Sequence, residues 1–148
     1  MVLVEFAIVL PIFILLILGI IYFGGLEAYS NQSTQLAEEG ARWAALNDNP
    51  SSSQTLQQYV ESLIQPEPLG GSATVSGASV YLYYPSGSTG AVGQSVRACV
   101  VTPLNSGFLG LGGGTVVQTA TMSIEQVQTS PEWTPDSTSS LPSSCPTS

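Results

Sequence analysis

The sequence predicts an α+β protein in which a long, hydrophobic N-terminal α-helix carries a small antiparallel β head. Two observations support this prediction. A run of 21 residues without a charge, from Phe6 to Leu26, continues into a helical pattern that reaches Trp43. Three later segments alternate apolar and polar residues as half-buried strands do, with turn-rich stretches between them. Since such a sheet has to cover its apolar face, we expect it to pack on the helix.

The composition excludes several classes of function. Only 8% of the 148 residues are charged, with ten Asp or Glu, two Arg, no Lys and no His, for a net charge of −8. Nucleic-acid binding needs clustered cations, so no nucleic acid is expected as a partner. The absence of His and Lys removes the usual general base and the Schiff-base nucleophile, and two Cys cannot fill a zinc site. We therefore expect no enzyme, no cofactor and no metal.

The apolar run is long enough to span a membrane. A helix needs about 20 such residues to cross a bilayer, and residues 1–26 are predicted to form this segment. A cleaved signal peptide would have a basic start, a shorter apolar core and a small-residue cleavage site, and the sequence shows none of these. The alternative is a buried core helix of a soluble domain.

Glu5 places a carboxylate inside this apolar segment, where a charge is costly and normally marks a function with a specific partner. No Lys or Arg precedes the segment, so we expect Met1 to be a mature N-terminus left by processing of a basic leader. Arg42 would lie about 55 Å away along a continuous helix. The α-amino group of Met1 is then the candidate partner, in the same chain or in a staggered neighbour. Alternatively, Glu5 is protonated or binds lipid headgroups at the interface.

Pro11 and three glycines interrupt the apolar run. Proline in a helix interior removes a hydrogen bond and favours a kink, which membrane helices tolerate. Gly19, Gly24 and Gly25 allow another helix to approach closely, and they also weaken the helix locally. Close packing and local melting are both open alternatives.

The helix is expected to continue beyond the membrane segment and to end near residue 48, because Pro50 disfavours helix at the residue before it. A seam at spacings of three and four should pack against the head; it contains Leu26, Tyr29, Ser33, Leu36, Gly40 and Trp43. The residues that fall off this seam, and should face solvent, are Glu27, Glu38, Glu39 and Arg42.

Residues 49–128 are predicted to form the head. Ser51 to Ser53 offer N-caps for a short amphipathic helix, which Pro66 and Pro68 would stop; its apolar face is Leu56, Tyr59, Val60, Leu63 and Ile64. The predicted strands are Ala73–Tyr84, Ser95–Val101 and Thr115–Val127. Each strand places three residues on one face: Val80, Leu82 and Tyr84; Val96, Ala98 and Val100; Ala120, Met122 and Ile124. The glycine cluster Gly110 to Gly114 lacks the lysine of a phosphate-binding loop and is interpreted as a connection.

Residues 129–148 contain 11 Ser or Thr and four Pro, a composition that cannot bury enough apolar surface to fold alone. Cys145 lies near the end of this tail, and the only other cysteine is Cys99 in the middle predicted strand. A bridge between them would strap the tail across the sheet and would imply an oxidising, extracytoplasmic compartment. Two free thiols are the alternative. The Ser/Thr/Pro composition also makes the tail a candidate O-glycan acceptor.

Two stretches of the sequence resemble a known family. Residues 4–11, VEFAIVLP, followed by Leu18-Gly19-Ile20 and Phe23-Gly24, closely resemble the N-terminus of TadE-like pilins of the tight-adherence (Tad, or Flp) branch of type IV pilus systems. Residues 37–45, AEEGARWAA, resemble the alanine-rich stretch of the same family, and residues 120–125, ATMSIE, are similar to its closing strand. The N-terminal resemblance covers about 45 residues, and the head resembles the family only loosely.

The resemblance implies a type IV pilin-like fold and a precursor that a prepilin peptidase cleaves before Met1. It also implies that Glu5, at the fifth mature position, pairs with the N-terminal amine of a neighbour, and that the pilus assembly machinery is a partner. The protein would reside in the bacterial inner (cytoplasmic) membrane before assembly and in an extracellular surface pilus afterwards. Family members are usually minor pilins or pseudopilins, whereas a smooth, low-charge surface favours a main subunit.

Three functions are therefore considered. The first is a structural pilin that forms a helical homo-oligomer, with its N-terminal helix in the filament core. The second is a minor, membrane-anchored pseudopilin that primes or caps another pilus. The third is a bitopic extracellular binding module, for which Tyr81, Tyr83 and Tyr84 would supply an exposed aromatic patch, although alternating tyrosines on a strand are more often sheet surface and core.

Overall fold

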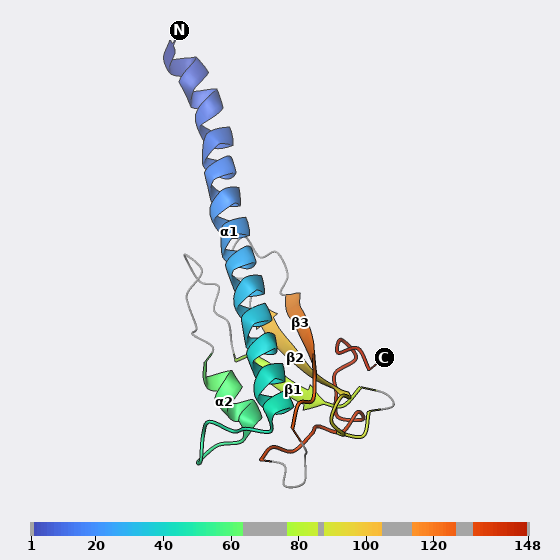
Figure 1. The fold of residues 1–148 in the computed structure, drawn as a ribbon. Helices are drawn as coiled ribbons and strands as arrows, with labels where there is room; N and C mark the ends of the chain where they lie inside the picture. Colours follow the sequence, from blue (N-terminus) through green and yellow to red (C-terminus); the bar gives the residue numbers. More distant parts are fainter. Residues whose placement is uncertain (1, 64–76, 86–87, 105–113, 127–131, 148) are drawn as a thin grey trace.

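A computed structural model describes residues 2–63, 77–85, 88–104, 114–126 and 132–147. One long helix, α1 (Val2–Leu46), projects from a small head that contains a short helix, α2 (Leu56–Ser62), and a three-stranded sheet (Figure 1). The strands are β1 (Ser79–Tyr83), β2 (Ser95–Leu104) and β3 (Gly114–Ser123), all antiparallel and in the order β1-β2-β3. This architecture confirms the predicted α+β class with a long N-terminal helix.

The second half of α1 is the main wall of the core, because a stripe of small and apolar residues faces the sheet. The predicted seam is confirmed at its described central positions, since Tyr29, Ser33, Leu36 and Gly40 are buried. The stripe is wider than predicted, since four alanines beside the seam are also buried: Ala37, Ala41, Ala44 and Ala45. Trp43 is half-buried, and the residues predicted to face solvent, Glu27, Glu38, Glu39 and Arg42, are all exposed.

The C-terminus of α1 is capped by contacts from distant parts of the chain. Asn47 has a φ of 51°, the left-handed conformation that commonly ends helices. Two of the last carbonyl groups, which have no partner inside a helix, are used by other elements. The carbonyl oxygen of Ala44 accepts from Trp133, and that of Ala45 accepts from the backbone N–H of Glu125 at 3.1 Å. These bonds fix the end of the helix to the head.

The sheet presents one face to α1 and the opposite face to the C-terminal tail. The even-numbered strand residues Val80, Leu82, Val96, Ala98 and Val100 are buried against the helices, with Ile124 directly after β3 in the same cluster. The odd-numbered residues Tyr83 and Cys99 are buried on the other face, together with Cys145 of the tail. Six of the nine predicted inward residues are thus buried, and the other three, Tyr84, Ala120 and Met122, are partly buried against the same cluster.

The strands and the short helix differ from the predicted ranges in several places. β1 begins at Ser79, and β2 continues to Leu104, three residues past the predicted end. The N-cap of α2 is Thr55 rather than Ser51 to Ser53, because Thr55 and Gln58 form a reciprocal capping box. The predicted positions that lie outside the described residues are 73–76 and 127, Ile64, Pro66 and Pro68, and glycines 110–113.

The C-terminal tail is folded onto three sides of the head. The Trp133 side chain is only 2% exposed and belongs to the core on the helix side of the sheet. Asp136 lies at the free edge of β1, where its N–H donates to the carbonyl of Leu82 and its Oδ2 accepts from the N–H of Leu82. Beyond this edge Cys145 is bonded to Cys99 on the far face, with 6.0 Å between their Cα atoms. The tail is therefore held to the head by Trp133 and Asp136 as well as by its cysteine.

Candidate functional site

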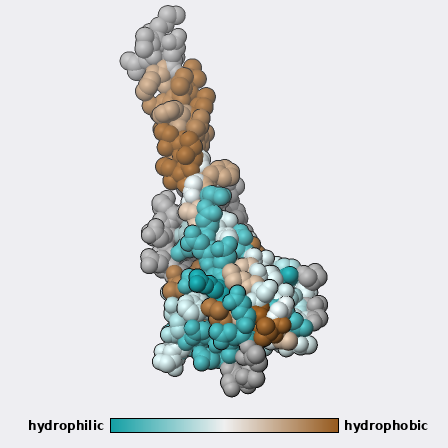
Figure 2. Space-filling model, in the orientation of Figure 1, coloured by the Kyte–Doolittle hydropathy of each residue, from teal (hydrophilic) through white to brown (hydrophobic). Residues whose placement is uncertain are grey.

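The N-terminal half of α1 is a largely exposed apolar surface in the described part of the chain. Residues 6–25, called here the apolar rod, extend away from the head, and the space-filling view shows hydrophobic residues along the rod and a mostly hydrophilic head (Figure 2). Large side chains are exposed around its whole circumference, including Phe6 at 63%, Leu15 at 64% and Phe23 at 72%. A helix that is hydrophobic on every side belongs in a membrane or inside a larger assembly.

The rod meets the physical requirements of a membrane span. Among the described residues there is one helix long and apolar enough to cross a bilayer, and its most apolar window has a mean hydropathy of 3.0 with none of it buried in the molecule. Its exposure rules out the alternative of a core helix buried within this chain. Length and composition therefore indicate a segment that is covered by lipid or by other helices.

The structure places the predicted packing residues on one unbroken helix. Pro11 lies inside α1, and Gly19, Gly24 and Gly25 fall in the same continuous helix. A Cβ atom added at Gly19 or Gly24 would meet nothing within 4 Å, so no contact inside the molecule requires a glycine there. Any packing role of Gly19 or Gly24 would therefore involve contacts outside the chain.

Of the two predicted assembly residues, Met1 and Glu5, the structure describes only the backbone of Glu5. Met1 lies outside the described residues, and so does the side chain of Glu5, whose backbone belongs to α1. The structure does not bring Arg42 near them, because Arg42 is on the last turns of α1 beside the head, where it lines a cavity with Leu46 and Glu125.

The tyrosines proposed for a binding patch do not form one exposed surface, and Tyr81 is partly buried on the tail side of the sheet. Tyr83 is fully buried on the tail side of the sheet, where its hydroxyl donates to the carbonyl of Pro146. Tyr84 is on the opposite side and packs against Trp133, with 5.6 Å between ring centroids. Burial raises the pKa of both Tyr83 and Tyr84 above the ordinary value of 10.0, and for Tyr83 a hydrogen bond and the charge of Arg97 partly oppose this shift. These tyrosines stabilise the head rather than present an aromatic surface.

Sequence reasoning missed three residues that hold the head together. Glu61 Oε1 accepts from the N–H of Val80 at 3.1 Å, and Asp136 does the same for Leu82, so two carboxylates cover the free edge of β1. Trp133 fills the core beside them. A tryptophan in a Ser/Thr/Pro-rich segment was the one available signal. Within the described ranges, no three His, Cys, Asp or Glu residues come together in a way that could hold a metal ion.

Comparison with known proteins agrees with the geometry of the rod. Residues 1–42 match the family model described as TadE-like protein, a stretch that includes the whole apolar rod and ends at Arg42. No curated protein and no solved structure matches the chain. The family is associated with Tad pili and is structural rather than enzymatic, and the apolar rod is consistent with membrane anchoring. Residues 1–42 are thus similar to TadE-like proteins, and the predicted resemblance to that family is confirmed.

Proposed function

We propose that this chain is a structural pilin of an extracellular, type IV Tad-like filament and that it polymerises through its apolar rod. One observation carries the proposal: a single helix is apolar and largely exposed over residues 6–25 and packs into the core of the head from Tyr29 onward. The rod is equally compatible with lipid and with a bundle of similar helices. Assembly would therefore exchange lipid contacts for helix contacts while the head stays folded outside.

Glu5 is proposed to set the axial register of this assembly by pairing with the α-amino group of Met1 in a neighbouring subunit. A carboxylate in an apolar environment needs a partner of opposite charge or a proton. Inside the chain, Arg42 is 37 residues further along the same helix, beyond the reach of any side chain. A staggered neighbour supplies the cation, and only one stagger brings the two groups together.

The proposed location of the subunit changes as the filament assembles. The subunit would wait in the inner (cytoplasmic) membrane, a prepilin peptidase would process it, and the pilus assembly machinery would transfer it to the surface filament. The bridge between Cys99 and Cys145 supports a head that lies in an oxidising compartment.

The first test is electron microscopy of fibres sheared from cells that express the precursor, combined with mass spectrometry of their subunits. Filaments made mainly of this chain, beginning at Met1, would support the proposal. Recovery only in the membrane fraction, or as a trace in fibres of another subunit, would contradict it and favour a minor pseudopilin that primes or caps those fibres.

The second test addresses the register. Glu5→Gln removes the charge with little change in volume, so the variant should stay in the membrane fraction and enter filaments poorly. Glu27→Gln is the matched control, since Glu27 is an exposed residue of the same helix beyond the rod. Normal filaments from the Glu5 variant would rule out the register role and leave the rod's packing role intact.

A further inference from the structure

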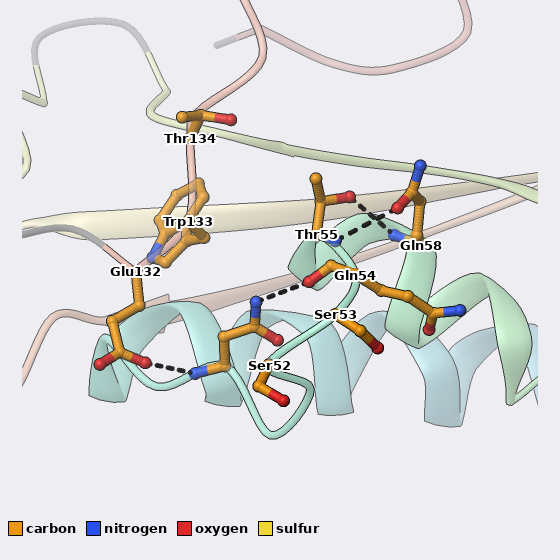
Figure 3. A pocket seen from close by; sticks show the side chains of 9 residues that line it. Ser52, Ser53, Gln54, Thr55, Gln58, Glu132, Trp133 and Thr134 are labelled. Atoms are coloured by element: carbon orange, nitrogen blue, oxygen red, sulfur yellow. Dashed lines mark hydrogen bonds between the residues drawn. The ribbon is translucent and has the colours of Figure 1, made fainter.

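The end of the head farthest from the rod contains a polar pocket. It has a volume of about 390 Å³, within the range of about 300–1,000 Å³ typical of small-molecule sites. The pocket lies where the segment that follows α1 faces the start of the tail (Figure 3). Its lining residues are Asn49, Ser52, Ser53, Gln54, Thr55, Gln58, Glu132, Trp133 and Thr134.

Hydrogen bonds hold the two sides of this pocket in place. Glu132 Oε2 accepts from the N–H of Asn49 at 3.2 Å, and the N–H of Glu132 donates to the side chain of Asn47 at 3.1 Å. The side-chain amide of Asn49 also donates to the backbone carbonyl of Gln54 at 2.9 Å. At the other wall, Thr55 and Gln58 exchange the two bonds of the capping box. These bonds hold the backbone around the pocket in place, which lowers part of the entropic cost of binding a ligand.

Several polar groups of the lining are not used by the fold. Within the described part of the chain, the side chains of Ser52, Gln54 and Thr134 make no hydrogen bond, and the Gln58 amide uses only its oxygen. Hydroxyl and amide groups of this kind both donate and accept. They complement a ligand whose own groups also do both, as the adjacent hydroxyls of a sugar ring do.

The charge and polarity of the lining exclude other classes of ligand. The only Lys or Arg residues in the sequence are Arg42 and Arg97, and neither lines the pocket. Because the Glu132 carboxylate does line it, the pocket would repel an anionic ligand. One carboxylate is too few for a calcium site. Eight of the nine lining side chains are polar, which is a poor match for an apolar ligand. A peptide would normally need a strand edge, an apolar groove or a charge cluster.

We propose that this pocket binds a neutral saccharide. Trp133 is fixed by its hydrogen bond to Ala44 and by Tyr84, and being 2% exposed it supplies a rigid wall rather than a broad stacking platform. Binding is thus expected to be in the millimolar range and to depend on hydrogen bonds. The pocket lies beside the C-terminal end of α1, at the opposite pole from the rod, so it stays accessible when the rod is covered. The proposal does not require that the chain form filaments.

The test uses the full chain, isotopically labelled, in a detergent without a sugar headgroup. Methyl glycosides of glucose, galactose, mannose and N-acetylglucosamine are titrated while the indole N–H signals are followed by NMR. The Trp133 signal should shift with at least one glycoside, while that of Trp43, which does not line the pocket, should not. Glucuronic acid, the anionic counterpart, should bind at least tenfold more weakly than the best neutral glycoside.

A double variant separates binding from folding. Ser52→Ala with Gln54→Ala removes two side chains that make no hydrogen bond in the fold, so the unfolding midpoint should not change, while the Kd should rise about tenfold. Gln35→Ala, an exposed glutamine of α1, is the matched control and should bind normally. The proposal is overturned if no neutral glycoside shifts Trp133, if glucuronic acid binds equally well, or if the double variant binds like the parent.

Discussion

The indole Nε1 of Trp133 donates a hydrogen bond to the carbonyl oxygen of Ala44 at 3.2 Å, across 89 residues of sequence. Ala44 is near the end of the long helix, where carbonyl groups lack helical partners. One side chain therefore both fills the core and caps the helix. This contact joins the first and the last described segments of the chain.

Replacing Trp133 with Ala should destabilise the head by about 3–5 kcal/mol, because it empties a large core volume and removes the bond to Ala44. Urea unfolding followed by circular dichroism measures the loss. Trp43→Ala is the control, and because Trp43 is half-buried its effect should be clearly smaller. Equal losses in the two variants would contradict the anchoring role of Trp133.

Asp136→Ala should weaken the free edge of β1. The substitution leaves the N–H of Leu82 without its 2.9 Å acceptor, at an expected cost of about 1–3 kcal/mol for a charge-assisted bond. Asp136→Asn retains an acceptor and should cost less. Hydrogen exchange at the Leu82 amide is the direct measurement. Unchanged protection in the alanine variant would show that the carboxylate does not cover the edge.

Breaking the bridge between Cys99 and Cys145, which are 46 residues apart, should cost about 2–4 kcal/mol. Replacing both cysteines with alanine should lower the unfolding free energy by about as much as adding reductant to the parent protein does. Reductant should not lower the stability of the double variant further. Limited proteolysis should then cleave residues 137–147 first, because Trp133 and Asp136 still hold the start of the tail. Cleavage that begins upstream of Trp133 would contradict this order.

Gly40→Ala should stabilise the head, although Gly40 is buried. A Cβ atom there would lie 3.5 Å from Leu82 and 3.6 Å from Val60, which are ordinary contact distances, and alanine is favoured over glycine in a helix by about 1 kcal/mol. Gly40→Leu adds volume that these neighbours already occupy and should destabilise by about 1–3 kcal/mol. Thermal unfolding of both variants tests the prediction, which fails if alanine lowers the midpoint.

Alkaline pH should destabilise the head through Tyr83. Burial raises the pKa of its phenol above 10.0, so the folded state retains the proton while the unfolded state loses it. The contribution is full below the unfolded pKa and is lost as pH rises through the folded pKa. Tyr83→Phe should flatten the decline in unfolding free energy above pH ~10. An unchanged slope in this variant would show that other groups cause the decline.

The parts of the fold that depend on periodicity could be predicted from the sequence. The burial of Leu36 and Gly40 followed from helical spacing, and that of Val96 and Ala98 from alternation. These patterns are local, because each element has to place its apolar residues on one face. The apolar rod was predictable from its uninterrupted run of uncharged residues, and it lies within the part that matches a known family.

The tail could not be predicted, since its contacts are nonlocal and its composition suggests disorder. Trp133 and Asp136 bind elements 89 and 54 residues away, and no local pattern specifies such pairings. The predicted N-cap of α2 was wrong for a different reason. Serine is a good cap, and Ser51 also has a glutamine three residues later, Gln54, but in the structure the two reciprocal bonds form between Thr55 and Gln58.

The continuity of α1 determines how the head would bear a mechanical load. If the rod is held and the head is pulled along the helix axis, force enters the head through the stretch from Tyr29 to Ala45, about 24 Å of helix at 1.5 Å per residue. Contacts along this whole length would have to slide in shear together. With no hinge or linker between rod and head, the load cannot peel the contacts apart one turn at a time.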